Sequence, residues 1–249
     1  MQRKSKIVLT VVLIAVWLAS LVWLVYAFNG FNVRTKVVEQ TRPAVKVDNS
    51  VSNARRQSIQ HDATTSHVNN LDKRGLISIP KLSIFEPVYN DAYSTYGLRY
   101  GANQVINNRS DKLTDFGVGN VVIASHNYAD GKFGFGPLQQ KVNRNDPYIT
   151  NGYLQSNDWL NGQNVYLANQ QGIFVYRITG QDVVKLSDRK PLGSTTKPTL
   201  TLLTCLEPND SFRIITKAKL INAYSWDKAP AKLVNYFNKN TQKTNIRPN

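Results

Sequence analysis

Cys205 is the only cysteine among 249 residues, and it stands where a nucleophile could act. Because one cysteine cannot form an internal disulfide, it is either a reactive thiol or a residue without a special role. It follows residues 198–204, where β-branched and apolar side chains alternate as in a strand. A turn-rich connection separates it from Arg213, which begins another strand-like run. We therefore expect the thiol and an arginine at the facing ends of two successive strands.

A histidine and this arginine could complete a catalytic group with the thiol. Of the three histidines, His61 and His67 lie in a polar stretch, whereas His126 directly follows a strand-like run. A cysteine nucleophile needs a nearby group for proton transfer. His126 precedes Cys205 by 79 positions, so only the fold can bring them together. Arg213 could stabilise a developing oxyanion. Taken singly, the two residues could also be an ordinary strand-end histidine and a surface arginine.

Short apolar runs separated by glycine, proline and asparagine predict the all-β architecture that would position these residues. The runs are 76–79, 84–88, 119–124, 164–167, 173–178, 182–186, 200–205 and 213–221. Their number and spacing predict a closed barrel rather than an alternation of strands and helices. Residues 141–160 are predicted to form a helix or a long loop, and residues 231–237 a helix.

Three motifs, in this order along the chain, resemble the signatures of sortases. They are Gly119-Asn-Val-Val-Ile-Ala-Ser-His126, Thr201-Leu-Leu-Thr-Cys205 and Arg213. The segments 75–82 and 98–102 are similar to the first strand and a glycine turn of that family, so the resemblance covers about residues 75–222. It implies a closed eight-stranded sortase-type β-barrel with short helices, and a cysteine transpeptidase similar to class A.

The resemblance also implies roles, substrates and partners. Cys205 would attack an LPxTG-type sorting signal between Thr and Gly, His126 would transfer protons, Arg213 would bind the substrate and stabilise the oxyanion, and Thr204 would help to shape the oxyanion site. The partners would be secreted proteins that carry LPxTG and an amine of a cell-wall peptidoglycan precursor. Some relatives bind calcium through acidic loop residues. Asp111 and Asp115 supply few oxygens for a cation that takes six to eight, so we expect no cofactor.

The first 28 residues predict a membrane anchor. Residues 7–28 carry no charge, and a transmembrane helix needs about 20 apolar residues. Arg3, Lys4 and Lys6 precede this run and favour a cytoplasmic N-terminus. A cleaved signal peptide is the alternative, but its apolar region usually has about 7–15 residues. We expect a single-pass protein of the cell membrane with an extracellular catalytic domain.

The chain is therefore predicted to have four parts. Residues 1–30 form the cytoplasmic tip and anchor, 31–74 an extracellular stalk, 75–222 the catalytic barrel and 223–249 a basic C-terminal extension. The formal charge of +15 favours anionic cell-wall polymers or lipid headgroups. The anchor argues against nucleic acid as a partner. Two alternatives remain: a non-catalytic, membrane-anchored wall-binding module, and a different Cys-His wall hydrolase.

Overall fold

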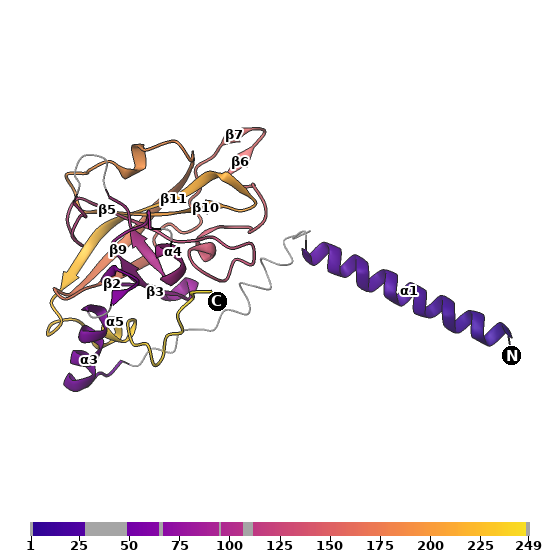
Figure 1. Ribbon diagram of the computed structural model, residues 1–249, viewed down its shortest axis with the longest axis horizontal. Coiled ribbons are helices and arrows are strands. Elements are labelled where there is room, and N and C mark those ends of the chain that lie inside the picture. Colours follow the sequence, from indigo (N-terminus) through magenta and orange to yellow (C-terminus); the bar gives the residue numbers. More distant parts are fainter. Residues whose placement is uncertain (1, 28–48, 65–66, 95, 107–111, 248–249) are drawn as a thin grey trace.

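The computed structural model describes residues 2–27, 49–64, 67–94, 96–106 and 112–247 (Figure 1). The helices are α1 (Gln2–Ala27), α3 (Asn53–Thr64), α4 (Gly97–Tyr100) and α5 (Ala231–Asn235), with 3-10 turns η2 (Pro80–Leu82), η3 (Gly136–Leu138) and η4 (Lys190–Leu192). The strands are β1 (His67–Val68), β2 (Leu71–Ile79), β3 (Ile84–Tyr89), β4 (Ala102–Gln104), β5 (Asn120–Ala124), β6 (Ile149–Thr150), β7 (Tyr153–Leu154), β8 (Asn164–Ala168), β9 (Ile173–Lys185), β10 (Thr199–Leu206) and β11 (Asn209–Tyr224).

Eight of these strands close into a barrel, as the sequence predicts. Their order is β2-β3-β4-β5-β10-β11-β9-β8, and a further pairing of β2 with β8 closes the ring. The short β1 pairs with β2 outside the ring, and β6 and β7 form a separate hairpin. Most neighbours are antiparallel, but β3 runs parallel to β4, and β5 runs parallel to β10. The pairing of β5 with β10 sets the two motif strands side by side.

The alternation along β10 decides which of its side chains reach the reaction centre. Leu200 and Leu202 are fully buried and pack in the barrel interior with Val121 and Ile123 of β5. Because successive side chains of a strand point to opposite faces, Leu203 and Cys205 lie on the outer face. Both are only partly buried. Cys205, the predicted nucleophile, is therefore accessible from outside the barrel, while its neighbours Leu200 and Leu202 anchor the strand.

The predicted number of barrel strands, eight, agrees with the structure, but two individual strand predictions are wrong. The runs 173–178 and 182–186 are one continuous strand, β9. Thr179 and Gly180 interrupt the apolar pattern at a β-bulge, where the register against β11 shifts between Lys217 and Ala218. The strand β4 was missed because only three residues form it, directly after the predicted glycine turn. The segment 141–160 is a loop that carries the β6–β7 hairpin rather than a helix.

Both predicted flanking parts contribute to the packed structure. The predicted boundary at residue 75 falls inside β2, and α3 lies within the predicted stalk. Two buried residues of α3 pack in one apolar cluster with the C-terminal segment (Figure 1). The members from these two parts are Ile59, Ala63, Trp226, Ala229, Val234, Tyr236 and Phe237. Two buried apolar residues are too few to give a helical periodicity, so residues 55–60 indicate at most a short surface helix and no core element. Residues 31–48 of the predicted stalk lie outside the described residues.

The long N-terminal helix α1 covers most of the segment predicted as an anchor. Within the described part of the chain, no helix combines the length and hydropathy of a membrane span.

Candidate active site

The parallel register of β5 and β10 brings Cys205 and His126 next to each other. The last pair in this ladder is Leu203 with Ala124. Cys205 lies two residues after Leu203, and His126 lies two residues after Ala124. Because paired strands lie about 4.8 Å apart, the two residues lie at the same level on neighbouring segments. The fold thus joins the two motifs that 79 positions separate in the sequence.

Three hydrogen bonds continue this contact beyond the end of β5. The Ser125 amide donates to the Leu203 carbonyl at 3.2 Å. The Thr204 hydroxyl donates to the Ser125 carbonyl at 2.8 Å, and the Asn127 side-chain amide donates to the Cys205 carbonyl at 2.9 Å. The residues on both sides of the histidine are therefore fixed against the segment that carries the nucleophile.

Thr204 makes a different contact from the one expected of a residue that shapes the oxyanion site. Its side chain is buried, and its hydroxyl bonds a backbone carbonyl, which only accepts. A hydroxyl has one hydrogen to donate, so this hydrogen is not free for an oxyanion. The contact makes Thr204 a positioning residue that joins β10 to the histidine segment.

Arg213 lies directly opposite Cys205 in the antiparallel pair of β10 and β11. Its Nη1 donates to the carbonyl of Asp210 at 2.5 Å and to that of Phe212 at 2.9 Å. These bonds tie the guanidinium to the backbone at the start of β11 and use one of its three nitrogens. The thiol therefore has a histidine segment on one side and an arginine on the other.

Burial and charge move both titrating groups away from their ordinary pKa values. Burial raises the pKa of the Cys205 thiol above 9.0, the nearby Arg213 charge opposes this, and the carboxylates of Glu207 and Asp210 add to it. Burial lowers the pKa of His126 below 6.5, and the positive charge of Arg99 lowers it further. Near neutral pH the resting pair is thus a neutral thiol and a neutral imidazole, and the thiolate–imidazolium form is the minor one.

The histidine segment turns back tightly after His126. The Phe135 amide donates to the His126 carbonyl at 2.7 Å. Gly134, with φ of +58°, allows this approach, because a Cβ there would lie 2.2 Å from that carbonyl oxygen. The His126 ring also lies 5.3 Å from the Tyr128 ring between centroids. The histidine is therefore held from its backbone and its ring.

An apolar cluster lies on the outer face of β5 and β10, beside the thiol. Its buried members are Val105, Val122, Ala124 and Leu192, and its partly buried members are Ala92, Leu98 and Leu203. Leu203 is two residues before Cys205 on the same face of β10. An apolar segment of a bound peptide could pack here while its next residues reach the thiol.

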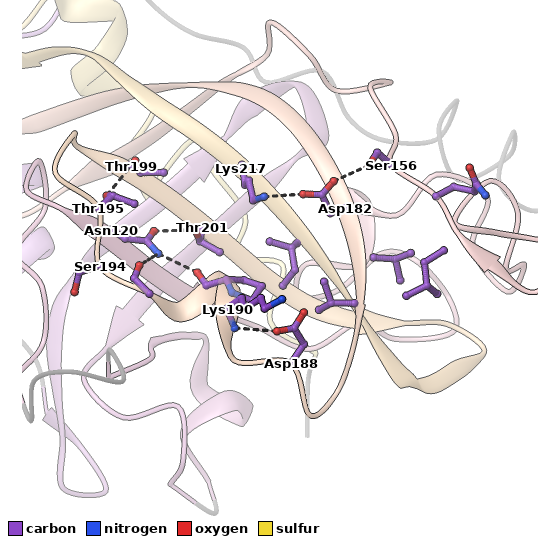
Figure 2. A pocket seen from close by; sticks show the side chains of 17 residues that line it. Asn120, Ser156, Asp182, Asp188, Lys190, Ser194, Thr195, Thr199, Thr201 and Lys217 are labelled. Atoms are coloured by element: carbon purple, nitrogen blue, oxygen red, sulfur yellow. Dashed lines mark hydrogen bonds and ion pairs between the residues drawn. The ribbon is translucent and has the colours of Figure 1, made fainter.

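A second feature of the outer face is a polar pocket of about 540 Å³, shown in Figure 2. Thr199 and Thr201 of β10, Lys190 of η4 and the Asp182–Lys217 ion pair line it, with a 2.7 Å distance in the pair. None of the three catalytic candidates lines this pocket. Because η4 contributes Leu192 to the apolar cluster and Lys190 to the pocket, it borders both.

The other candidates from the sequence lie away from the reaction centre. His61 is in α3, and the His67 Nδ1 contacts Asp72 at 2.7 Å. Asp115, considered for calcium, pairs with Arg74 at 2.9 Å, and Asp111 lies outside the described residues. Among the described residues, no three His, Cys, Asp or Glu side chains are grouped as metal ligands.

The sequence of the barrel matches one known protein family. The sortase domain model matches residues 77–221. The chain belongs to the sortase family. This sortase is a cysteine transpeptidase rather than a non-catalytic wall-binding module.

The chain is also similar to individual sortases. The chain is 27% identical over 202 residues to sortase A of Streptococcus agalactiae, which covers 79% of this chain and 72% of the relative. Sortase A of Listeria monocytogenes has a TM-score of 0.48 at 21% identity, covering 61% of this chain and 90% of that one. Sortase C-3 of Streptococcus pneumoniae has a TM-score of 0.45 at 20% identity, covering 81% and 86%.

Several residues around the centre of this sortase have no counterpart in the motif prediction. Asn127 holds the Cys205 carbonyl, and the Arg99 charge acts on the histidine. Glu86 of β3 is fully buried and accepts a 2.9 Å hydrogen bond from the Ser125 hydroxyl. Burial raises the pKa of Glu86 to about 8. Asn127 directly follows the histidine and could have been noticed, but Glu86 lies in an apolar strand whose pattern gives no sign of the partner.

Proposed function

We propose that this sortase cleaves an LPxTG-type sorting signal between Thr and Gly and joins the acyl part to an amine of a peptidoglycan precursor. The observation that carries the proposal is the position of Cys205 on β10, between the His126 segment after β5 and Arg213 of β11. Nucleophile, acid–base group and cation come from three adjacent strands of one sheet. This set matches what acyl transfer to and from a thiol needs.

In the first half of the reaction, the Cys205 thiolate attacks the Thr carbonyl carbon of the signal. Arg213 faces the developing oxyanion and donates hydrogen bonds to it. The C–N bond to Gly breaks, and His126 gives its proton to the departing amine. The product of this half is a thioester between Cys205 and the Thr carbonyl, together with a released Gly-terminated peptide.

In the second half, the amine of the acceptor attacks the thioester carbonyl. His126, now neutral, takes a proton from the incoming nitrogen. The C–S bond breaks, a new amide forms, and the sulfur leaves as the thiolate that began the cycle. The proton given in the first half is thus recovered in the second.

The apolar cluster supports a substrate with Leu and Pro before the cleaved bond. Leu203 precedes Cys205 by two residues, or about 7 Å along an extended strand. A bound peptide in extended form would have its Leu-Pro part over the cluster when its Thr carbonyl reaches the sulfur. A sorting signal of the LPxTG type has apolar residues in that place, which also fits the proposed class A type.

We propose further that residues 7–28 anchor this sortase in the cell membrane with the catalytic barrel outside the cell. The uncharged run and the basic residues before it support this orientation. In α1, Val12, Trp17 and Val22 have large exposed apolar side chains. A chain without residues 1–30 should be soluble and fully active, and residual partition into membranes would contradict the anchor.

The test of the proposed reaction uses the chain from residue 49 onward and a fluorescent peptide containing Leu-Pro-Ala-Thr-Gly. With glycinamide present, we expect the peptide to be cut after Thr and the glycinamide adduct to form. Mass spectrometry of the intact protein should find the acyl group on Cys205. Peptides with Leu replaced by Asp, or Thr by Val, are matched controls for the substrate.

The outcomes separate the parts of the proposal. Cleavage by Cys205→Ala at the wild-type rate would make the nucleophile assignment wrong. An acyl adduct that forms from an unrelated peptide but not from the LPxTG peptide would overturn the substrate. Release of free acid without the glycinamide adduct at any amine concentration would overturn transfer to an amine.

A further inference from the structure

The C-terminal segment, residues 238–247, reaches the loop that carries His126. Asn245, near the end of this segment, is buried and bonds Gly134 and Phe85 with four polar groups, and its side chain also interacts with the buried Glu86. Two of the bonds join Asn245 to Gly134: the Gly134 amide donates to the Asn245 carbonyl at 2.9 Å, and the Asn245 side-chain nitrogen donates to the Gly134 carbonyl at 2.6 Å. With Phe85 of β3, the Phe85 amide donates to Asn245 Oδ1 at 2.9 Å, and the Asn245 amide donates to the Phe85 carbonyl at 3.2 Å.

These four bonds lead directly to the catalytic histidine. Gly134 forms an isolated bridge with Asn127, and the following amide, of Phe135, bonds the His126 carbonyl. Asn245 therefore holds one side of the turn that contains His126, with β3 as the fixed support. No residue of β10 or β11 takes part in these four bonds, and the turn contacts the Cys205 backbone only through the Asn127 side chain among the bonds described above.

The same segment also reaches the ring side of the histidine. The Arg247 guanidinium carbon lies 5.2 Å from the centroid of the Tyr128 ring, and Tyr128 in turn lies 5.3 Å from the His126 ring. Phe133 meets the Tyr128 ring edge-on at 6.4 Å. A cation over an aromatic face is attracted to it by about 0.5–2 kcal/mol. Arg247 thereby restrains the Tyr128 ring, which lies beside the His126 ring.

We propose that Asn245 and Arg247 are positioning residues for His126, Asn245 through its backbone turn and Arg247 through Tyr128. The inference rests on the proposed acid–base role of His126. Proton transfer to a leaving amine depends on where the imidazole lies, and a displacement of about 1 Å can lower the rate about 100-fold. Loosening the segment should lower kcat, while the binding of the sorting signal, which uses other elements, stays the same.

The first test uses Arg247→Ala, because this side chain is exposed and its removal leaves the fold intact. The matched control is Lys243→Ala, which removes one exposed positive charge from the same segment. We expect kcat for LPxTG peptide cleavage to fall about 3- to 10-fold in Arg247→Ala, the range that a lost cation–π contact allows, with KM within about 2-fold. Lys243→Ala should equal the wild type, and Arg247→Lys should recover part of the loss.

The second test uses Asn245→Asp, which keeps the Oδ1 acceptor for Phe85 and loses the donor to Gly134. Asn240→Ala, at an exposed position of the segment, is its control. We expect kcat to fall at least about 10-fold, corresponding to about 1.4 kcal/mol. The rate of Cys205 alkylation by iodoacetamide should stay within about 2-fold, because burial and Arg213 set it. The imidazole signals of His126 in NMR spectra should broaden or split.

Two further results would overturn the inference. Arg247→Ala and Asn245→Asp could both retain the wild-type kcat while His126→Ala is inactive, in which case the histidine acts but the segment does not position it. Alternatively, kcat and Cys205 alkylation could change together with a loss of folded protein, which would make the segment a general support. If His126→Ala keeps its activity, the proposed function itself is wrong, and the positioning role falls with it.

Discussion

The two sides of the reaction centre are held in different ways. Cys205 and Arg213 face each other inside two long antiparallel strands, β10 and β11, that pair over most of their length. His126 lies beyond the end of β5, in a turn held by one hydrogen bond from Thr204 to Ser125, by the bond between Phe135 and His126, and by two bonds between Asn245 and Gly134. Many backbone hydrogen bonds fix the position of a residue inside a strand pair, whereas only a few fix the position of a residue in a turn. The proposed nucleophile therefore has a fixed position, whereas the position of the proposed acid depends on fewer bonds.

The largest expected effect removes the acid and keeps the nucleophile. His126→Ala should lower the rate of peptide cleavage at least about 1,000-fold, because the leaving amine then receives no proton from the enzyme. Alkylation of Cys205 should remain within about 3-fold of the wild type, because burial is the main cause of its raised pKa. Steady-state cleavage and iodoacetamide kinetics measure both. A parallel loss of alkylation would mean that the two sides are not independent.

On the nucleophile side, Arg213→Ala should lower kcat about 100- to 1,000-fold, the usual effect of losing an oxyanion donor. The reactive thiol should also become less acidic, because the Arg213 charge lowers the pKa of Cys205. Arg213→Lys keeps the charge but loses the planar donor group, so it should recover the alkylation rate better than kcat. Equal recovery of both by lysine would show that charge, rather than directed hydrogen bonding, is what the reaction uses.

Two glycines test the histidine side with matched backbones. Gly134→Ala places a Cβ 2.2 Å from the His126 carbonyl oxygen, whereas Gly152, also at positive φ, has nothing within 4 Å. Gly134→Ala should lower kcat about 10- to 100-fold through displacement of the turn. Gly152→Ala should cost only about 1 kcal/mol of backbone strain and leave kcat unchanged. Cleavage assays and thermal melts compare them, and equal activity of the two variants would contradict the role of the turn.

The pH dependence of kcat/KM reports on the titration of both His126 and Cys205. As the pH falls through the lowered pKa of His126 the imidazole becomes protonated while the thiol stays neutral, and as the pH rises through the raised pKa of Cys205 the thiol ionises while the imidazole has no proton to give. Because the pKa of His126 is lowered and that of Cys205 raised, kcat/KM should be bell-shaped, with a broad top between these limits. The apparent pKa of Cys205 alkylation should lie above 9.0. A thiol that reacts as an acid of pKa below about 8 would rule out this electrostatic picture.

The smallest effect on activity is expected from the buried Glu86. Its folded pKa of about 8 exceeds the ordinary value of 4.5, so the folded state holds a proton that the unfolded chain releases. Stability therefore falls as the pH rises between these two values. Glu86→Gln can accept the Ser125 hydrogen bond without a titrating group. It should leave kcat within about 2-fold and flatten the decline of the melting temperature from pH 5 to 8. An unchanged slope would exclude Glu86 as the source of that decline.

The sequence predicts the nucleophile side of this sortase better than the histidine side. Cys205 and Arg213 stand in strands whose alternation is visible, and the turn between them fixes their register. The motif also identifies His126, but not Asn245, which lies 119 positions away and acts through its polar groups in a single tertiary contact. Local periodicity carries no information on such a contact.

The fold shows the same division. The barrel follows from its apolar runs, because their alternation is imposed by burial on one face. Thr179 and Gly180 predict a turn between two strands, because a β-bulge within one strand interrupts the apolar pattern in the same way as a turn. The flanking segments were assigned as stalk and extension because few apolar residues, among them Ile59 and Phe237, carry their packing. Where packing rests on isolated side chains, the sequence alone does not indicate it.

The parallel pairing of β5 with β10 has a consequence for how the enzyme gains its activity during folding. Such a pair cannot form from a local hairpin, since a long stretch of chain, including β8 and β9, must be laid down between its strands. Contacts between distant positions form late, after the entropy of closing that loop has been overcome. Until then the chain carries a thiol without its proton donor. Incompletely folded molecules therefore lack the paired groups that acyl transfer needs, and we expect transfer to begin only when the barrel has been assembled.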